Sequence, residues 1–169
     1  MTLPYIRRAA PDTTHLYLGQ PQTVLARTLD TGGAFAVVEE VMRAGLEPPL
    51  HTHTREDEAF YVLDGQLDFQ IGNEHRRATP GDFVYLPRGM PHAFKVVTPT
   101  ARMLVLLTPG GFEAFFGAMA TPLQDDPLLP TPADFQRLVS EAPAYGIQWA
   151  MPATADQAPQ GSMFPEGAS

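Results

Sequence analysis

The chain has 169 residues, enough for one domain with a sizeable core. Its 19 acidic residues outnumber its 11 basic residues, which gives a formal net charge of −8 at pH 7. An acidic chain without a basic run is a poor match for nucleic acid or for an anionic membrane surface, so we expect neither as a partner. The absence of cysteine excludes disulfides, thiol catalysis and cysteine-based zinc sites.

Composition also indicates the fold class. The chain contains 14 glycines and 18 prolines, yet 44% of its residues are hydrophobic, which is too many for a disordered chain. Many short elements separated by turns fit these numbers, as in an all-β sandwich or barrel. The polar beginning of the chain and the shortness of every apolar run lead us to expect a cytoplasmic protein without a signal peptide or membrane span.

The first two thirds of the chain predict an N-terminal arm followed by strands. We expect the arm at residues 1–12 and strands at 23–29, 34–42, 59–63, 67–71, 83–86, 92–97 and 102–107. The segment 59–63 is apolar on both faces, so we expect it to be buried on both sides. Its outer residues, Ala59, Tyr61 and Leu63, need a cover that helices or a second subunit can supply, and we therefore predict a homodimer.

The apolar spacing changes to that of a helix near Gly111. Four apolar residues then share one helical face: Phe112, Phe115, Phe116 and Met119. We expect this face to pack against the barrel, and a lid over the barrel mouth is the alternative. A second helix is expected to begin with Thr131 as its N-cap and Pro132 in its first turn, followed by a short strand at 147–151.

No internal repeat is visible, so we expect one domain over residues 1–169. It comprises an arm and first strand (1–30), a barrel (31–109), a helical extension (110–151) and a poorly structured tail (152–169).

Three histidines and a glutamate stand where strands are expected to begin. His51 and His53 are two residues apart, so an extended chain projects both imidazoles from one face. Glu58 and His92 each open an inward apolar stripe, and a carboxylate in that place is costly unless a cation such as a metal ion meets it. An isolated His-x-His would be read as a surface pair, but this combination favours a metal site.

Other polar residues near the motif are interpreted as ordinary. Glu56 and Asp57 are rival carboxylates that we expect in a solvated acidic turn. His15 and His75 are expected on the surface, and Trp149 is expected to be a packing residue.

These segments resemble the two sequence motifs of cupins. The first motif runs from Gly45 through His51, His53 and Glu58 to Gly65, and the second runs from Gly81 through Pro87 and Gly89 to His92. The second motif continues to an asparagine, where this chain has Val96. The resemblance implies a jelly-roll β-barrel with a C-terminal helical extension, and one metal ion held by His51, His53, Glu58 and His92.

A wider resemblance links the chain to single-domain cupins related to the quercetin 2,3-dioxygenase family. It rests on Thr31-Gly-Gly, on Arg55-Glu-Asp-Glu, on the Gly-Gly-Phe-Glu-x-Phe-Phe segment from Gly110, and on a helix ending in Ala144-Tyr-Gly-Ile-Gln. In that family an enolic oxygen of the substrate binds the metal, a glutamate takes the substrate proton, and O2 cleaves the ring. Carried over, Glu58 would be both a metal ligand and the catalytic base.

Three imidazoles and one carboxylate suit a divalent ion of Mn, Fe, Co, Ni, Cu or Zn. We expect inward apolar residues to line the substrate pocket: Phe60, Val62, Phe69 and Phe94. Such a pocket favours a flat, apolar or aromatic enol such as a flavonol, together with O2, so we expect a metal-dependent dioxygenase. The alternatives are a metal-binding or small-molecule-binding protein without turnover, and a cupin isomerase or oxidase.

Overall fold

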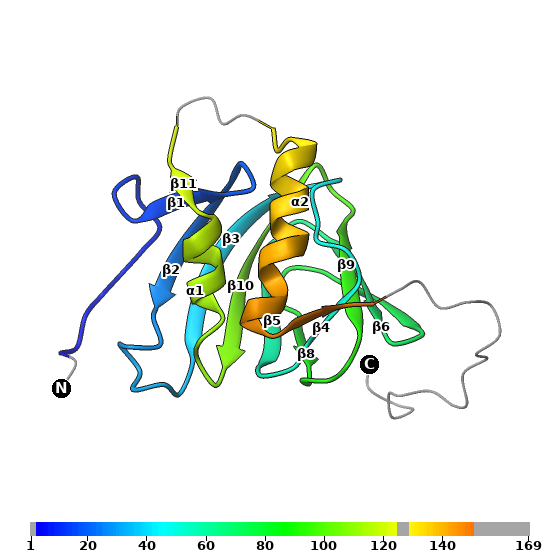
Figure 1. Ribbon diagram of the computed structural model, residues 1–169, viewed down its shortest axis with the longest axis horizontal. Coiled ribbons are helices and arrows are strands. Elements are labelled where there is room, and N and C mark those ends of the chain that lie inside the picture. The colour runs from blue at the N-terminus through cyan, green and yellow to red at the C-terminus, as the bar shows by residue number, and fades with distance from the viewer. Residues whose placement is uncertain (1–2, 125–128, 151–169) are drawn as a thin grey trace.

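The computed structural model describes residues 3–124 and 129–150, which form two antiparallel sheets and a helical cover (Figure 1). The larger sheet has the strand order β11 (Thr121–Pro122), β1 (Thr14–Tyr17), β2 (Gln20–Ala26), β3 (Ala36–Arg43), β10 (Thr100–Thr108), β5 (Asp57–Asp64) and β8 (Phe83–Leu86). The smaller sheet has the order β12 (Ile147–Trp149), β4 (His51–His53), β9 (His92–Val96), β6 (Leu67–Ile71) and β7 (Glu74–Ala78). This is the all-β jelly-roll barrel that the sequence predicts.

The core lies between the two sheets because each strand turns its apolar residues inward. Along β6, Leu67, Phe69 and Ile71 are buried while the residues between them are half-exposed, as the two-residue period of a strand requires. The ring of Phe69 lies 5.2 Å from that of Phe60 on β5 and 5.7 Å from that of Phe94 on β9. These three rings join the two sheets by apolar contact.

Strand β3 shows the same alternation with one exception. Its inward positions are Ala36, Val38, Glu40 and Met42, and all four are buried. Glu40 therefore places a carboxyl group in an otherwise apolar stripe.

The helical extension consists of α1 (Glu113–Met119), α2 (Pro132–Glu141) and a short 3-10 helix (Ala142–Tyr145). The predicted start of α2 is confirmed: the Thr131 hydroxyl accepts a hydrogen bond from the backbone N–H of Asp134, and the Asp134 carboxylate accepts one from that of Thr131. Leu138 of α2 is 1% exposed, and truncating such a side chain to alanine costs about 2–5 kcal/mol.

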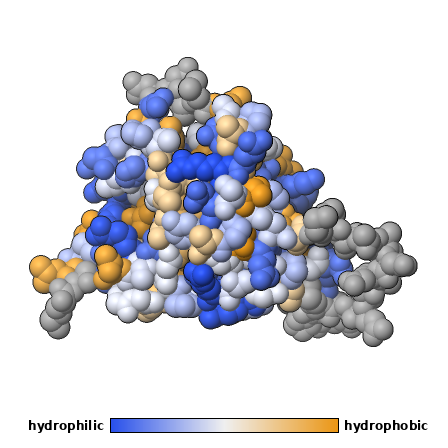
Figure 2. Space-filling model, in the orientation of Figure 1, coloured by the Kyte–Doolittle hydropathy of each residue, from blue (hydrophilic) through white to orange (hydrophobic). Residues whose placement is uncertain are grey.

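The extension closes the cavity between the sheets. Figure 1 shows α1 and α2 in front of the larger sheet, and a guanidinium nitrogen of Arg137 on α2 donates to the Ala118 carbonyl of α1 at 2.8 Å. Phe115 and Phe116 pack against Tyr17, with ring centroids 6.1 and 5.1 Å away. The aromatic face is thus both packing surface and lid, while the outer surface of this cover mixes polar and apolar side chains (Figure 2).

Some strand predictions were incomplete or wrong. Strands β1, β7 and β11 had not been expected, since β7 is almost entirely polar and β11 has only two residues. The expectation that segment 59–63 is buried on both sides is wrong at Tyr61, which is 42% exposed because the helices cover the cavity rather than the outside of β5. Residues 151–169, including the expected tail, lie outside the described residues. No described helix is long and apolar enough to cross a membrane.

Candidate metal centre

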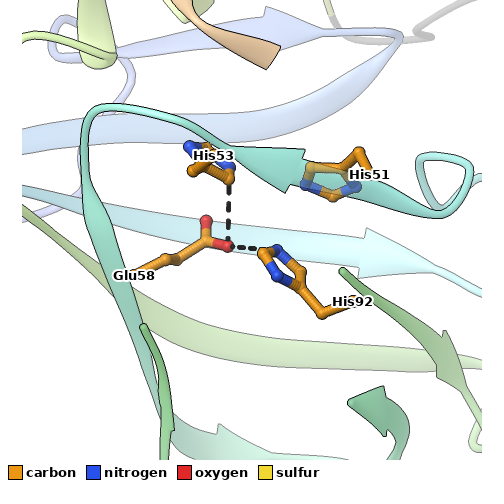
Figure 3. Close-up of side chains that lie close together, drawn as sticks. All are labelled: His51, His53, Glu58 and His92. Atoms are coloured by element: carbon orange, nitrogen blue, oxygen red, sulfur yellow. Dashed lines mark hydrogen bonds and ion pairs between the residues drawn. The ribbon is translucent and has the colours of Figure 1, made fainter. Parts of the chain in front are cut away.

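Four buried side chains converge on one point between the sheets. His51, His53, Glu58 and His92 each offer a ligand atom, and these atoms all lie within 4.8 Å of one another. Figure 3 shows the Glu58 carboxylate pointing toward His53 and His92, with dashed lines to both. The Oε2 atom of Glu58 lies 3.1 Å from Nε2 of His92 and 3.7 Å from Nε2 of His53.

The strand register explains this convergence. His51 and His53 project from one face of β4, and His51 stands directly opposite His92 on the neighbouring strand β9. Glu58 comes from β5, in the other sheet, after the chain turns at residues 54–56. The two sheets therefore contribute different ligand types, with three imidazoles on one side and the carboxylate on the other.

The outer nitrogens of two histidines are already hydrogen-bonded to backbone carbonyls. Nδ1 of His51 lies 2.8 Å from the carbonyl oxygen of Pro49, and Nδ1 of His92 lies 2.9 Å from that of Met90. A carbonyl only accepts, so each Nδ1 carries the proton and donates it. In a neutral imidazole this leaves the lone pair on Nε2, the atom that faces the cluster.

This arrangement fits a cation. The Nε2 lone pair of neutral His92 faces a carboxylate oxygen of Glu58 at 3.1 Å, so two acceptors oppose each other unless a proton or a metal ion lies between them. Imidazole nitrogens and a carboxylate oxygen are ligands that divalent transition metals accept together. The four residues therefore fit one such ion, and the donor set alone does not choose its identity.

The charges of the cluster suit metal binding as well. Burial alone would raise the pKa of Glu58, but the imidazoles of His53 and His92 outweigh it and lower the pKa to about 2. Burial, reinforced by the neighbouring His92, lowers the pKa of His51 to about 4. At neutral pH Glu58 is therefore an anionic carboxylate and His51 a neutral imidazole, the forms of these two residues that bind a metal. For His53 burial would lower the pKa, but the carboxylates of Glu58 and Glu56 outweigh it and raise the pKa.

Glu56 does not belong to a solvated turn, and that expectation is wrong. Glu56 is 4% exposed, and its Oε2 lies 3.8 Å from Nδ1 of His53. Both atoms are buried and neither has a hydrogen-bond partner in the part of the chain that the structure describes. Phe112 packs on the His53 ring at 4.5 Å, and a Cβ on Gly111 would lie 3.6 Å from Oε1 of Glu56, so the segment before α1 covers both residues.

Glu56 thus lies next to Nδ1 of His53, the position that a backbone carbonyl occupies next to Nδ1 of each of the other two histidines. A carboxylate in this place is a frequent partner of metal-bound histidine, because it fixes the ring and leaves Nε2 free for the ion. The neighbouring Asp57 is directed away, since its carboxylate accepts hydrogen bonds from Arg88, including one of 2.9 Å from Nε. His15 and His75 are exposed, as expected.

A cavity adjoins three of the four ligands, His51, His53 and Glu58. It has a volume of about 40 Å³ and is lined mostly by apolar side chains from both sheets and from the helical extension. Phe60 and Phe94 line it as expected, but Val62 and Phe69 do not: both are 0% exposed, and they lie in the core next to those rings. The sequence patterns placed all four predicted pocket residues on inward faces of their strands, which is correct. An inward-facing residue can, however, belong to the core below the cavity instead of lining the cavity.

Several lining residues had not been expected in the site, and three of them carry polar or aromatic groups. Trp149 lies with its ring 5.9 Å from that of His51, because β12 pairs with β4. Tyr17 and Glu40 line the cavity from β1 and β3. Glu40 could have been found from the sequence, because it alternates with the exposed residues of β3 and so faces inward. Nothing in the sequence near Trp149 indicates that its strand pairs with β4.

The position that carries asparagine in the second cupin motif has a packing role here. Val96 is 7% exposed and pairs with Leu67 across the β6–β9 ladder. It lies at the far end of β9 from His92 and is not among the ligands or the lining residues.

Comparison with known proteins agrees with the fold. A family model described as "Cupin domain" matches residues 37–108, the span that holds all four candidate ligands. Residues 37–108 of the chain are therefore similar to a cupin domain. Two solved structures share the fold: KdgF from Halomonas sp. (TM-score 0.51, 22% identity, 66% of this chain and 91% of that one) and the nucleoside dehydratase Pac13 (TM-score 0.52, 16% identity, 70% and 91%).

The chain also resembles curated enzymes. It is 26% identical over 148 residues to quercetin 2,3-dioxygenase of Bacillus subtilis, covering 86% of this chain and 44% of that one. It is 35% identical over 92 residues to quercetin 2,3-dioxygenase of Aspergillus japonicus (50% and 26%), and 41% identical over 66 residues to dimethylsulfoniopropionate lyase DddQ of Ruegeria pomeroyi (38% and 32%). The chain spans less than half the length of each of these relatives.

Proposed function

We propose that this protein is a metal-dependent dioxygenase that acts on an apolar or aromatic enol, such as a flavonol. The observation that carries the proposal is a buried, anionic carboxylate placed among three imidazoles at the wall of an apolar cavity. The similarity to two quercetin 2,3-dioxygenases supports the same substrate class.

In this proposal His51, His53, Glu58 and His92 hold one divalent transition metal. A redox-capable ion in that position supplies Lewis acidity toward an enolic oxygen and an electron path to O2. The apolar walls, which include Phe60 and Phe94, bind the flat part of the substrate and exclude water.

Glu58 is the proposed catalytic base. The Glu58 carboxylate is anionic at neutral pH, which is the form that accepts a proton. The imidazoles of His53 and His92 orient one carboxylate oxygen, and the cavity beside them is where a substrate hydroxyl would come within hydrogen-bond reach.

The cavity must enlarge for such a substrate to enter. A cavity of about 40 Å³ holds no more than a few water molecules, and a flavonol is far larger. Phe112, Phe115 and Phe116 form part of the cavity wall, so displacement of the α1 segment enlarges the space directly.

The small volume of the cavity favours a second candidate, a non-oxidative reaction on a much smaller substrate. The similarity to the lyase DddQ fits this possibility, because dimethylsulfoniopropionate is a small molecule. The two candidates differ in whether O2 is consumed.

Oxygen uptake tests the proposal. The protein is stripped of metal, reloaded separately with Mn, Fe, Co, Ni, Cu or Zn, and incubated with a panel of flavonols and diketones in an oxygen electrode. We expect O2 consumption that requires a redox-capable metal and that is absent with Zn, which has no redox chemistry. Substrate loss without O2 consumption would favour the lyase-type candidate, and no reaction with any flavonol or diketone would overturn the dioxygenase proposal.

We also propose that the protein is a homodimer. Tyr61 on β5 and its cross-strand partner Phe83 on β8 are 42% and 61% exposed, and Tyr85 is 54% exposed. Strand β8 ends its sheet, so these rings form an apolar area beside an open strand edge, which is a surface suited to pairing. Light scattering should give twice the chain mass of 18.4 kDa, and Phe83→Glu should shift it to the monomer. A wild-type monomer at high concentration would contradict this.

A further inference from the structure

The carboxyl group of Glu40 is a second polar feature of the cavity, separate from the metal ligands. Glu40 interrupts the inward apolar stripe of β3 and is 7% exposed. Gln22 stands directly opposite on β2, and its side-chain amide donates a short hydrogen bond to Oε1 of Glu40. This amide orients the carboxyl group toward the cavity, where Glu40 is a lining residue.

Folding alone does not account for a carboxyl group at this position. Among residues 3–124 and 129–150, Gln22 is the one hydrogen-bond partner of the Glu40 side chain, and no Lys or Arg pairs with it. A buried carboxyl group without a cationic partner destabilises the fold, whereas an apolar residue would complete the stripe.

Glu40 is able to donate as well as accept a hydrogen bond. Burial raises its pKa to about 7, with the charge of Glu58 acting in the same direction and the bond from Gln22 acting against it. Near neutral pH the group is therefore partly protonated, and one oxygen remains for a ligand.

A second polar side chain lines the same cavity. Tyr17 is only 6% exposed. Burial and the nearby carboxylates of Glu40 and Glu58 raise the pKa of Tyr17, so its hydroxyl stays protonated. Two polar side chains on an otherwise apolar cavity wall suit a ligand that carries polar groups of its own.

Strand register separates this polar end from the metal ligands. Glu58 pairs with Leu107, and Leu107 pairs with Ala36, so Glu58 is level with the start of β3. The backbone of Glu40 lies four residues further along β3, about 13 Å by strand rise. A ligand that contacts both Glu40 and the metal ligands must carry polar groups at two separate positions.

We propose that Glu40, oriented by Gln22, is a substrate-binding residue, and that the substrate carries a hydroxyl or carbonyl group for it in addition to the oxygen that approaches the histidines. This inference rests on the proposed function and narrows its substrate class to aromatic or apolar molecules with oxygen substituents at two ends. A substrate with a single oxygen end leaves the Glu40 carboxyl group buried against carbon and binds more weakly.

Binding of two flavonols to the Zn-loaded protein tests the inference without turnover. Quercetin carries several ring hydroxyls, whereas 3-hydroxyflavone carries only the enolic one. Trp149 is the one tryptophan of the chain and lines the cavity, so quenching of its fluorescence reports binding there. We expect the wild type to bind quercetin about tenfold more tightly than 3-hydroxyflavone, the effect of one buried hydrogen bond.

Variants assign that preference to Glu40. Glu40→Met should weaken quercetin binding about tenfold, leave 3-hydroxyflavone binding unchanged and keep the metal content. Glu40→Gln, which preserves the hydrogen-bonding shape, should shift the preference in the same direction by a smaller factor and covers the case in which Glu40→Met does not fold. Glu39→Gln is the matched control, because Glu39 lies on the opposite face of β3 and pairs with Arg102.

Several results would overturn the inference. These are an unchanged preference in both Glu40 variants, equal weakening for both flavonols, and no binding of either flavonol to the wild type. Binding with the expected preference but no oxygen uptake with any metal would leave this inference standing and reject the dioxygenase proposal instead.

Discussion

Two carboxyl groups line the same cavity and are tuned in opposite directions. Glu58 and Glu40 are both buried, on strands of the same sheet, yet the pKa of Glu58 is lowered to about 2 and that of Glu40 is raised to about 7. Glu58 faces three imidazoles, whereas Glu40 faces one amide. The difference shows that the partner, and not burial itself, decides whether a carboxyl group in this barrel is ionised.

The two ends of the cavity therefore offer different chemistry. At the Glu58 end an anionic carboxylate and three imidazoles converge on one point, which suits a cation. The Glu40 end exchanges between neutral and ionised forms and is held by a single hydrogen bond, which suits a polar group of a ligand. Each prediction that follows changes one end and leaves the other as the internal reference.

The largest effect is expected from Glu58→Gln. The amide keeps the shape and one oxygen donor but removes the charge that accepts a proton. We expect most of the metal to remain, since three histidines can hold a divalent ion, and the rate of turnover to fall by about 100- to 10,000-fold. Metal analysis and oxygen uptake on the same sample measure both quantities.

Asp57→Asn is the matched control for Glu58→Gln, because Asp57 is the adjacent carboxylate but pairs with Arg88 outside the cluster. If the Glu58→Gln protein holds metal and turns over substrate at the wild-type rate, Glu58 is a metal ligand and not the catalytic base.

Removal of an imidazole should act on the metal rather than on the chemistry. His51→Ala or His92→Ala deletes one of four ligands, and we expect the metal affinity to fall by more than about 100-fold. Competition with a chelator of known affinity measures this, with His15→Ala as the control, since His15 is exposed on another strand. Full metal content at unchanged affinity in both variants would contradict the assignment.

Glu56 should have a smaller effect on the same measurement. Glu56→Ala leaves Nδ1 of His53 without the carboxylate behind it, and loss of such an outer partner typically costs 10- to 100-fold in metal affinity. Glu56→Gln keeps a polar oxygen behind Nδ1 of His53 and should stay within a few-fold of the wild type. Equal affinities for the Ala variant and the wild type would show that Glu56 does not position His53.

The smallest effect is a pH dependence of stability at the Glu40 end. The pKa of Glu40 is about 7 in the folded chain against an ordinary value of 4.5, so the folded state holds the extra proton between these values. The free energy of unfolding therefore loses this contribution as pH rises through that window. Glu40→Gln has no such loss and should gain about 1–3 kcal/mol relative to the wild type between pH 5 and pH 8.

Urea unfolding at the two pH values measures this difference. The lowered pKa of His51 affects both proteins in the same way, since it destabilises them only as pH falls below about 6.5, so it cancels in the comparison. No pH-dependent difference between Glu40→Gln and the wild type would mean that Glu40 is ionised in the folded chain.

Much of the fold was predictable where local rules and tertiary structure agree. The alternation of β6 and the N-cap signal at Thr131 specify their elements within a few residues, and the structure matches both. Strand β7 was missed because its exposed, charged residues carry no apolar period, and its pairing with β6 is what makes it a strand.

The candidate site likewise contains residues that local sequence identifies and residues that it does not. His51, His53, Glu58 and His92 were identifiable because spacing in extended chain determines which side chains share a face. The burial of Glu56 was not, because the cover over it comes from Gly111 and Phe112, some fifty residues later in the chain. Local sequence predicts which side chains share one face of a strand, but it does not predict which distant segment packs over that face.

The split of the four ligands between the sheets has a mechanical consequence. The histidines belong to the smaller sheet and Glu58 to the larger one, so an ion bound by all four is a cross-link between the two halves of the barrel. An ion that binds the folded chain alone stabilises it in proportion to the logarithm of its concentration over its dissociation constant. The melting temperature of this protein should therefore serve as a gauge of which ion occupies the site.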